Sequence, residues 1–320
     1  MFLFESMPWY AAAMGITVLL GLIFINEITR RSKHLAILTY FIIPLVCTFF
    51  LWPKTSGPGT PMGYWFPWVK TYSVLAGVLG FMALRYIPGL DKNKLMLIFP
   101  PLILSINILE AVFRDFQCYD YNGIVDGIFI QGGIWNIMNG LAGILSIVTI
   151  SGWYGIFIGK DKNKDMLWPD QLWFWIIAYD LWNFAYVYNC IPDHSFYSGA
   201  VLLLSCTIPA FFIKKGAWLQ HRAQTLALWA MFSLTMPYFA DTSIFAVKSS
   251  HSTTALIAVS ALALASNVAV FIYQFRRVFK FKLNPLKDEI FTDLNAYKEI
   301  VEKNKPSLKG SKSDKSKSVA

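Results

Sequence analysis

The chain has 320 residues, of which 56% are hydrophobic and 15% charged, whereas soluble domains carry about 25% charged residues. This composition excludes an ordinary soluble enzyme or binding module and predicts a multi-pass membrane protein in a lipid bilayer. Residues 276–320 contain twelve Lys or Arg and six Asp or Glu, and therefore +6 of the net charge of +9. A basic tail of this kind predicts contact with anionic lipid headgroups on the cytoplasmic side, and not nucleic-acid binding.

Nine apolar runs approach the length of about 20 residues that crosses a bilayer as a helix. They cover residues 8–28, 35–52, 69–87, 95–115, 133–158, 170–189, 196–213, 219–240 and 253–275. The second and the seventh are short. Because the connections are short as well, the sequence predicts one all-α helical transmembrane domain over residues 1–283.

Basic residues distinguish the two ends of these nine spans. Each odd-numbered span is followed by a basic cluster, whereas the loops after even-numbered spans carry few basic residues: Lys54, Lys70 and Lys248. The positive-inside rule then places the N-terminus outside and the C-terminus in the cytoplasm. A missed or additional span would put the later clusters on the wrong side, so the alternation also supports the count of nine.

The stretch ILEAVFRDFQ, residues 108–117, places charges at the end of the fourth span. In a helix, Asn107, Glu110 and Arg114 lie on one face, and Glu110 and Arg114 have the spacing of an ion pair. A charge within the membrane costs at least about 2.5–3.5 kcal/mol, so this face must contact protein or water. Two interpretations remain open: a structural ion pair at the outer rim, or the wall of an outward-facing polar cavity.

The sixth span carries an acidic residue near its middle, Asp180, with Asn183 on the same face. A carboxyl group at this depth must be protonated or paired. It is therefore a candidate for ligand or proton binding, and the alternative is a hydrogen-bonded structural acid.

Polar residues also mark the fifth and eighth spans. Asn136 and Asn139 share one face of the fifth span, where amides bond to neighbouring helices, so packing is the favoured role. In the eighth span, His221 and Arg222 lie near the cytoplasmic boundary, where side chains ordinarily extend to the aqueous surface. Asp241 follows near the outer surface. If the polar faces of spans four, five, six and eight converge, they enclose a cavity suited to a small-molecule ligand.

Two further features lie outside the spans. Cys118 and Cys190 both fall on the outer side, where a disulfide between them is possible. Residues 284–303 have a proline at their second position, Pro285, and apolar residues at helical spacing. This pattern predicts an amphipathic cytoplasmic helix. Residues 304–320 are rich in Lys and Ser and are predicted to be disordered.

Familiar catalytic and cofactor motifs are absent from the sequence. It contains no P-loop, no dinucleotide fingerprint, no HExxH and no GxSxG. No Cys or His cluster has metal-ligand spacing, so no metal site is predicted. The sequence does not identify a cofactor, and the oligomeric state stays open.

Four stretches carry a resemblance: ILEAVFRDFQ, WNIMNGLAGILSI, WFWIIAYDLWNFAY and GAWLQHRAQTLALW. Together they resemble an uncharacterised, domain-of-unknown-function family of bacterial multi-pass membrane proteins, over most of residues 1–280. The resemblance implies a bacterial inner or cytoplasmic membrane. It implies no activity and no catalytic residues.

Three functional hypotheses follow. The leading one is a secondary transporter or permease for a small solute, proton-coupled through Asp180. The second is an intramembrane enzyme acting on a lipid or another apolar substrate, with Asp180, Glu110 or His221 as acid or base. The third is a receptor or scaffold whose cytoplasmic tail binds a partner. The lack of catalytic motifs favours a non-enzymatic function.

Overall fold

The computed structural model describes residues 2–125 and 127–304, and most of this part of the chain is helical. The α-helices are α1 (Trp9–Arg31), α2 (Lys33–Ile37), α3 (Ile43–Phe50), α4 (Trp52–Thr55), α5 (Trp65–Tyr86), α6 (Lys94–Cys118), α7 (Ile134–Val148), α8 (Trp173–Cys190), α9 (Leu202–Phe212), α10 (Trp218–Thr235), α11 (Thr253–Phe281) and α12 (Asn295–Asn304). Single π-helical turns, Leu38–Ile42 and Ser195–Val201, join α2 to α3 and precede α9. Short 3₁₀ turns cover Leu90–Lys92 and Pro192–His194.

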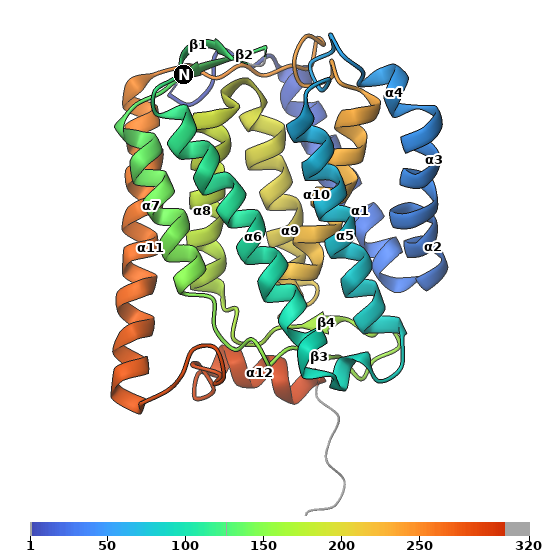
Figure 1. Ribbon diagram of the computed structural model, residues 1–320, viewed down its shortest axis with the longest axis vertical. Coiled ribbons are helices and arrows are strands. Elements are labelled where there is room, and N and C mark those ends of the chain that lie inside the picture. Colours follow the sequence, from blue (N-terminus) through green and yellow to red (C-terminus); the bar gives the residue numbers. More distant parts are fainter. Residues whose placement is uncertain (1, 126, 305–320) are drawn as a thin grey trace, which may run out of the picture.

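Among the described residues, the named strands form two small antiparallel hairpins. The first pairs β1 (Asn122–Val125) with β2 (Ile128–Gln131), and Asn122 lies opposite Gln131. The second pairs β3 (Phe157–Ile158) with β4 (Met166–Leu167), and Phe157 lies opposite Leu167. The two hairpins lie at opposite ends of the helical bundle (Figure 1).

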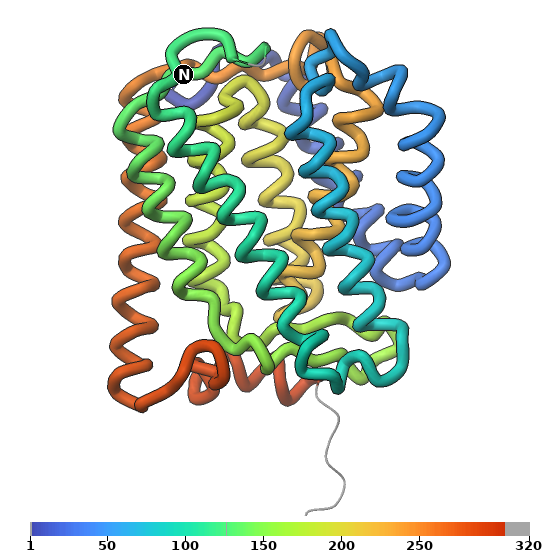
Figure 2. Tube along the Cα trace, viewed as in Figure 1, coloured from blue at the N-terminus to red at the C-terminus, as the bar shows by residue number. Residues whose placement is uncertain are grey.

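The long helices stand side by side in one bundle, with α12 lying across its lower end (Figure 1). Helix α11 packs on α7 and α8, α6 packs on α7, and α10 packs on α5 and α9. The α2–α3 segment is at the edge of the bundle. The trace in Figure 2 shows the N-terminal segment at the end opposite α12.

Several helices present large apolar side chains outward, as a bilayer requires. Exposed examples on α1, α3, α6, α9 and α11 are Phe24, Phe49, Phe113, Phe212 and Phe279. Six segments are long and apolar enough to cross a membrane: Trp9–Arg31, Lys33–Phe50, Trp65–Tyr86, Lys94–Cys118, Pro192–Phe212 and Thr253–Phe281. Among the described residues, α7, α8 and α10 stand within the same bundle but are shorter or more polar. The chain is therefore an all-α helical membrane protein.

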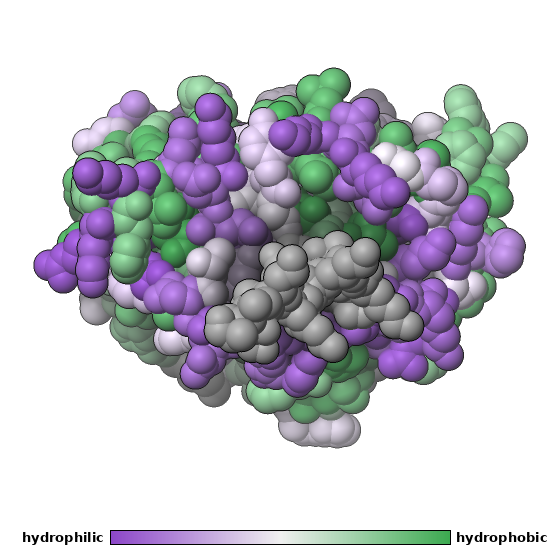
Figure 3. Space-filling view, turned by 90° about the horizontal axis from the view of Figure 1, so that it is seen from below, coloured by the Kyte–Doolittle hydropathy of each residue, from purple (hydrophilic) through white to green (hydrophobic). Residues whose placement is uncertain are grey.

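The basic clusters that follow the odd-numbered predicted spans gather at one end of the bundle. Seen from this end, the surface carries many hydrophilic side chains (Figure 3). By the positive-inside rule we assign this face to the cytoplasm, and the face with β1, β2 and the N-terminus to the outside. The alternation of basic loops along the sequence therefore agrees with the three-dimensional arrangement.

Two predicted helices differ from the observed ones. The predicted span 133–158 is wrong beyond Val148, because the chain turns at Gly152, whose φ of 63° is left-handed, and then forms the β3–β4 hairpin. The predicted helix over 284–303 forms only from Asn295. The backbone N–H groups of Ile290 and Phe291 donate to the Asp170 carboxylate instead of to helical carbonyl groups. The tail predicted to be disordered was 304–320: Asn304 is instead the last residue of α12, and 305–320 lie outside the described residues.

Candidate functional site

A cavity of about 180 Å³ lies in the middle of the bundle, between α5, α6, α8, α9 and α10. It extends from Leu219 and Arg222, near the cytoplasmic end of α10, towards Ser233 on the same helix and Met62 in the outer loop. Eleven residues separate Arg222 from Ser233, which corresponds to about 16 Å along a helix axis. On α10 the cavity therefore extends from near the cytoplasmic end of the helix to the outer rim.

Small side chains on α10 leave the space for this cavity. Ala223, Ala230 and Ser233 line it and recur at intervals of seven and three residues, so they lie on one face of the helix. Gly77 on the facing helix α5 has no side chain to fill the opposite wall, and Ile103 of α6 is its nearest neighbour. The pattern of small residues, rather than a break in a helix, creates the opening.

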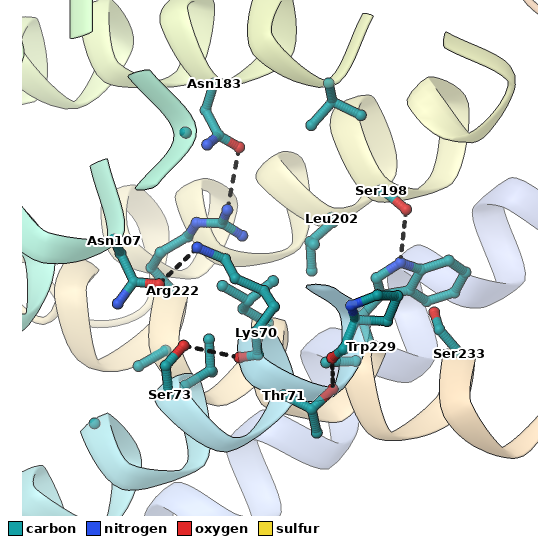
Figure 4. Close-up of a pocket in the computed structure, with 18 of the residues that line it drawn as sticks. Lys70, Thr71, Ser73, Asn107, Asn183, Ser198, Leu202, Arg222, Trp229 and Ser233 are labelled. Atoms are coloured by element: carbon teal, nitrogen blue, oxygen red, sulfur yellow. Dashed lines mark hydrogen bonds between the residues drawn. The ribbon is translucent and has the colours of Figure 1, made fainter. Parts of the chain in front are cut away.

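Two cationic side chains extend into this space from the neighbouring helices α5 and α10 (Figure 4). Lys70 of α5 donates to Asn107 Oδ1 at 2.7 Å and to Glu110 Oε2 at 3.3 Å. Arg222 of α10 donates through Nη2 to Asn183 Oδ1 at 3.1 Å. The side chain of Arg222 is almost completely buried, and in the described part of the chain its Nε and Nη1 have no hydrogen-bond partner.

The rest of the wall is largely apolar and aromatic. The indole Nε1 of Trp229 donates to Ser198 Oγ at 2.9 Å, which fixes the ring against the cavity (Figure 4). Tyr179 and Tyr186 line the side formed by α8. A mainly apolar cavity with a few convergent polar groups is typical of a small-molecule site.

Comparison with family models finds a match to a family of unknown function, DUF5692, over residues 5–303. The chain belongs to the DUF5692 family. This confirms the predicted membership of an uncharacterised family. Comparison with curated proteins finds no match. Comparison with solved structures finds none either.

In this DUF5692 protein, the predicted polar face of the fourth span does approach the cavity. Asn107 lines it, and Glu110 reaches it through Lys70. The predicted ion pair between Glu110 and Arg114 is wrong, because Glu110 pairs with Lys70 of α5 instead. The guanidinium of Arg114 lies over the ring of Tyr121, 5.6 Å from its centroid.

Asn136 and Asn139 lie away from the cavity, around the fully buried Asp115. Asn139 Nδ2 donates to Asp115 Oδ2 at 2.7 Å, and Asn136 Nδ2 donates to Oδ1 at 3.3 Å. The Asn136 side chain also accepts from Gly133 N–H at the start of α7. The cavity is consequently not formed by the predicted set of four spans, since α5 and α9 replace α7 in its wall.

The two cysteines predicted to lie on the outer side are both at this second cluster. Cys190 Sγ donates to Asp115 Oδ1 at 3.5 Å, and the Cys118 thiol lies close to Cys190. Both are buried free thiols. The structure thus brings them together but does not contain the disulfide that the sequence allows.

Asp180 and Asn183 are both on α8, but they face different neighbours. Asn183 lines the cavity and binds Arg222. Asp180 Oδ2 accepts from Thr207 Oγ1 of α9 at 2.6 Å, and Oδ1 has no partner among the described residues. Asp180 is therefore beside the cavity wall and interacts electrostatically with Arg222.

Asp241 and His221, the remaining candidates, lie towards the two membrane surfaces. Asp241 approaches Lys248 at 3.4 Å and His194 at 4.0 Å on the outer side. His221 is fully buried near the cytoplasmic end, where its Nδ1 lies 2.7 Å from Asn26 Nδ2. His221 points away from the aqueous surface, contrary to the prediction for this boundary position.

Below the cavity, a network of charges that the sequence did not reveal closes the cytoplasmic end. Asp165, in the turn before β4, accepts from Arg30 Nη1 at 2.6 Å and from Gln220 Nε2 at 3.0 Å. Arg85 and Lys214 each approach it at 3.9 Å. We call these five residues the inner-face network. In the sequence, Asp165 is an acidic residue in a basic loop, and this pattern is equally typical of a charge exposed to water.

The C-terminal segment covers this end further. Asp170 accepts from Ser151 Oγ at 2.5 Å and from the N–H groups of Ile290 and Phe291. Burial raises the pKa of Asp170 from 3.8 to about 6, although these donors favour the ionised form. On the surface of α12, hydrogen bonds from two lysines lower the pKa of Glu299 to about 2. Together these contacts hold α12 across the cytoplasmic end.

Proposed function

We propose that this chain is a secondary transporter for a small solute, and that the cavity is its substrate site in an outward-facing state. The observation that supports this most is the difference between the two ends of the cavity, because its inner end lies next to Gln220 of the inner-face network. The cavity reaches Met62 and Tyr64 in the outer loop, and towards the cytoplasm it ends at Leu219 and Arg222. A transporter in one of its two end states has this arrangement.

The inner-face network has the properties of a closed cytoplasmic gate. Asp165 links α1, α5 and α10 through Arg30, Arg85 and Gln220. These are contacts between separate elements, and a charge network of this kind has two discrete arrangements, formed or broken. Opening towards the cytoplasm would require Asp165 to separate from these partners.

Asp180 is our candidate for proton coupling. It is a largely buried carboxyl group with one oxygen lacking a partner in the described part of the chain. The groups that face it are Thr207 and Cys206 from α9, Arg222 from α10 and Tyr179 on its own helix. Arg222 also reaches the cavity, so a change of charge on Asp180 alters the field where a solute would bind.

The decisive experiment measures access to the bottom of the cavity from each side of the membrane. Cysteine replaces Leu219 in a Cys47→Ser background, and a membrane-impermeant maleimide is added to right-side-out and inside-out vesicles. The controls are Lys54→Cys in the outer loop and Lys162→Cys in the cytoplasmic loop; both native side chains are exposed. Each control should react from one side only.

A transporter is expected to expose Leu219→Cys to both sides, at rates that change with solute or with a pH gradient. Labelling from the outside alone, under every condition, would refute alternating access. A fixed pocket of that kind would suit a receptor or an enzyme. In an uptake assay, Asp180→Asn should remove the pH dependence, and unchanged pH dependence would refute the coupling role.

A further inference from the structure

The most unusual group in the cavity is the guanidinium of Arg222. Its residue is only 5% exposed, and within the described residues no carboxylate lies within the 4 Å of an ion pair. Of its donors, Nη2 binds a neutral amide oxygen while Nε and Nη1 are unpartnered. Tyr179 lies close enough to the guanidinium to favour its charged form, but it is not a partner of Nε or Nη1. A buried charge with free donors is costly unless something pairs with it.

A second cation increases this excess of positive charge. Lys70 points into the same space from α5, and the two cations influence each other electrostatically (Figure 4). Glu110 pairs with Lys70 at 3.3 Å, and Asp180 is directed to Thr207. The cavity thus contains two cations, and a carboxylate pairs directly with one of them. It is therefore suited to one more negative charge.

The two amide oxygens that lie beside the cations already accept hydrogen bonds from them. Asn107 Oδ1 accepts from Lys70, and Asn183 Oδ1 accepts from Arg222. The nitrogen atoms of Arg222 at the bottom of the cavity that still lack a partner within the described residues are, in contrast, hydrogen-bond donors. Planar or tetrahedral oxyanions accept from a guanidinium fork and an ammonium group in this way.

Apolar groups determine the other part of the ligand. On the outer side of Arg222 the wall includes the apolar side chains of Leu202, Leu226 and Trp229. An inorganic ion would leave these surfaces uncovered, whereas an organic ligand would remove them from water. The ligand that fits this cavity therefore has a negatively charged head group, which lies at the inner end, and an apolar body, which lies towards the outer side.

We propose that the cavity binds a small amphipathic organic anion, with a carboxylate or phosphate head between Arg222 and Lys70 and an apolar body against Trp229 and Leu202. This inference rests on the cavity of the proposed function and names its substrate class. The same oxyanion chemistry is present in free organic acids and in phosphate esters.

The test uses the purified full-length chain in lipid nanodiscs and four probes that share one aromatic ring: benzoate, phenyl phosphate, benzamide and benzylamine. Inorganic phosphate is the fifth. Thermal stabilisation gives the affinity of each. Benzoate or phenyl phosphate should stabilise the wild type saturably. Benzamide, benzylamine and inorganic phosphate should bind at least tenfold more weakly than the better of the two.

Three variants locate the site. Arg222→Gln should weaken binding of the anion about 10- to 100-fold, as expected for loss of charge-assisted hydrogen bonds. Lys70→Gln should weaken it about tenfold and keeps the test valid if Arg222→Gln does not fold. Lys54→Gln removes an exposed lysine outside the cavity and should leave binding unchanged.

Several results would overturn the inference: no stabilisation by either aromatic anion, benzamide as effective as benzoate, or equal binding by the wild type and both cavity variants. Inorganic phosphate binding as tightly as phenyl phosphate would refute the role of the apolar wall. Binding of the anion without access from both sides would refute the transporter but retain this site. Access from both sides, together with a preference for neutral or cationic probes, would refute this anion site but retain the transporter.

Discussion

Replacing Asp165 by Asn tests whether the inner-face network holds the cytoplasmic end of the bundle together. The carboxylate is completely buried and accepts from Arg30 at 2.6 Å and Gln220 at 3.0 Å, with Arg85 at 3.9 Å. Asparagine keeps the shape but removes the charge, and its amide group presents a donor to other donors. Breaking a buried ion pair typically costs about 3–5 kcal/mol.

The remaining partners of the two arginines reduce this cost. Arg30 keeps its ion pair with Glu27 at 2.8 Å. Arg85 keeps three backbone acceptors, the carbonyl oxygens of Arg30, Asn163 and Lys164. We therefore expect the lower end of the range, about 3 kcal/mol.

Asp161→Asn is the matched control, because it makes the same change in the same loop. Asp161 pairs with Lys214 at 2.5 Å, but its side chain is 38% exposed. A solvated pair contributes about 0–1 kcal/mol. Both variants lose one negative charge, so the difference between their stabilities measures the effect of burial.

Thermal unfolding of the purified protein measures the difference. At about 2 °C per kcal/mol, Asp165→Asn should lower the melting temperature by about 6 °C and Asp161→Asn by no more than about 2 °C. Arg30→Gln should also cost less in the Asp165→Asn background than in the wild type. Equal losses for the two Asp variants, or additive effects of Arg30→Gln and Asp165→Asn, would refute the reasoning.

Three further changes test other parts of the fold by the same measurement. The folded state keeps a proton on Asp170 that the unfolded chain releases above about pH 4, so stability should fall by up to about 3 kcal/mol between pH 4 and 6 and then level off. Asp170→Asn should remove that slope, and an unchanged slope would contradict the assignment. Asn139→Ala leaves the buried Asp115 without its 2.7 Å donor and should cost about 1–3 kcal/mol; a loss below 0.5 kcal/mol would contradict this. Gly143→Ala places a methyl group 2.7 Å from the Trp182 indole nitrogen and should cost about 1–3 kcal/mol, whereas Gly21→Ala, with open space around it, should be neutral or slightly stabilising.

The transmembrane helices were largely predictable because apolar runs of sufficient length have few alternatives. The predicted span 133–158 failed for a specific reason. Residues after Val148 remain apolar, and Ile150 and Ile156 are indeed buried, but in a loop below the bundle instead of in a helix. Composition distinguishes buried from exposed residues; it does not distinguish burial in lipid from burial under a loop.

The cavity was predicted only in part, because periodicity identifies the face of each helix but not which faces meet. Asn107 and Asn183 were selected as polar residues within spans, and both line the cavity. Lys70 and Arg222 were assigned to the outer loop and to the cytoplasmic boundary. Both assignments follow from distance to the nearest end of an apolar run. Long side chains at such positions can point either to the surface or inward, and here both point inward.

The charges of residues 108–117 then have two separate explanations on one helix. Asn107 and Glu110 lie on the side of α6 that meets Lys70 and the cavity. Asp115, on the other side, is held by the amides of α7. The two alternatives for this stretch, a structural role and a cavity wall, therefore apply to different faces of the same helix. Substitutions at Asn107 or Glu110 should change ligand affinity more than stability, and a substitution at Asp115 should do the opposite.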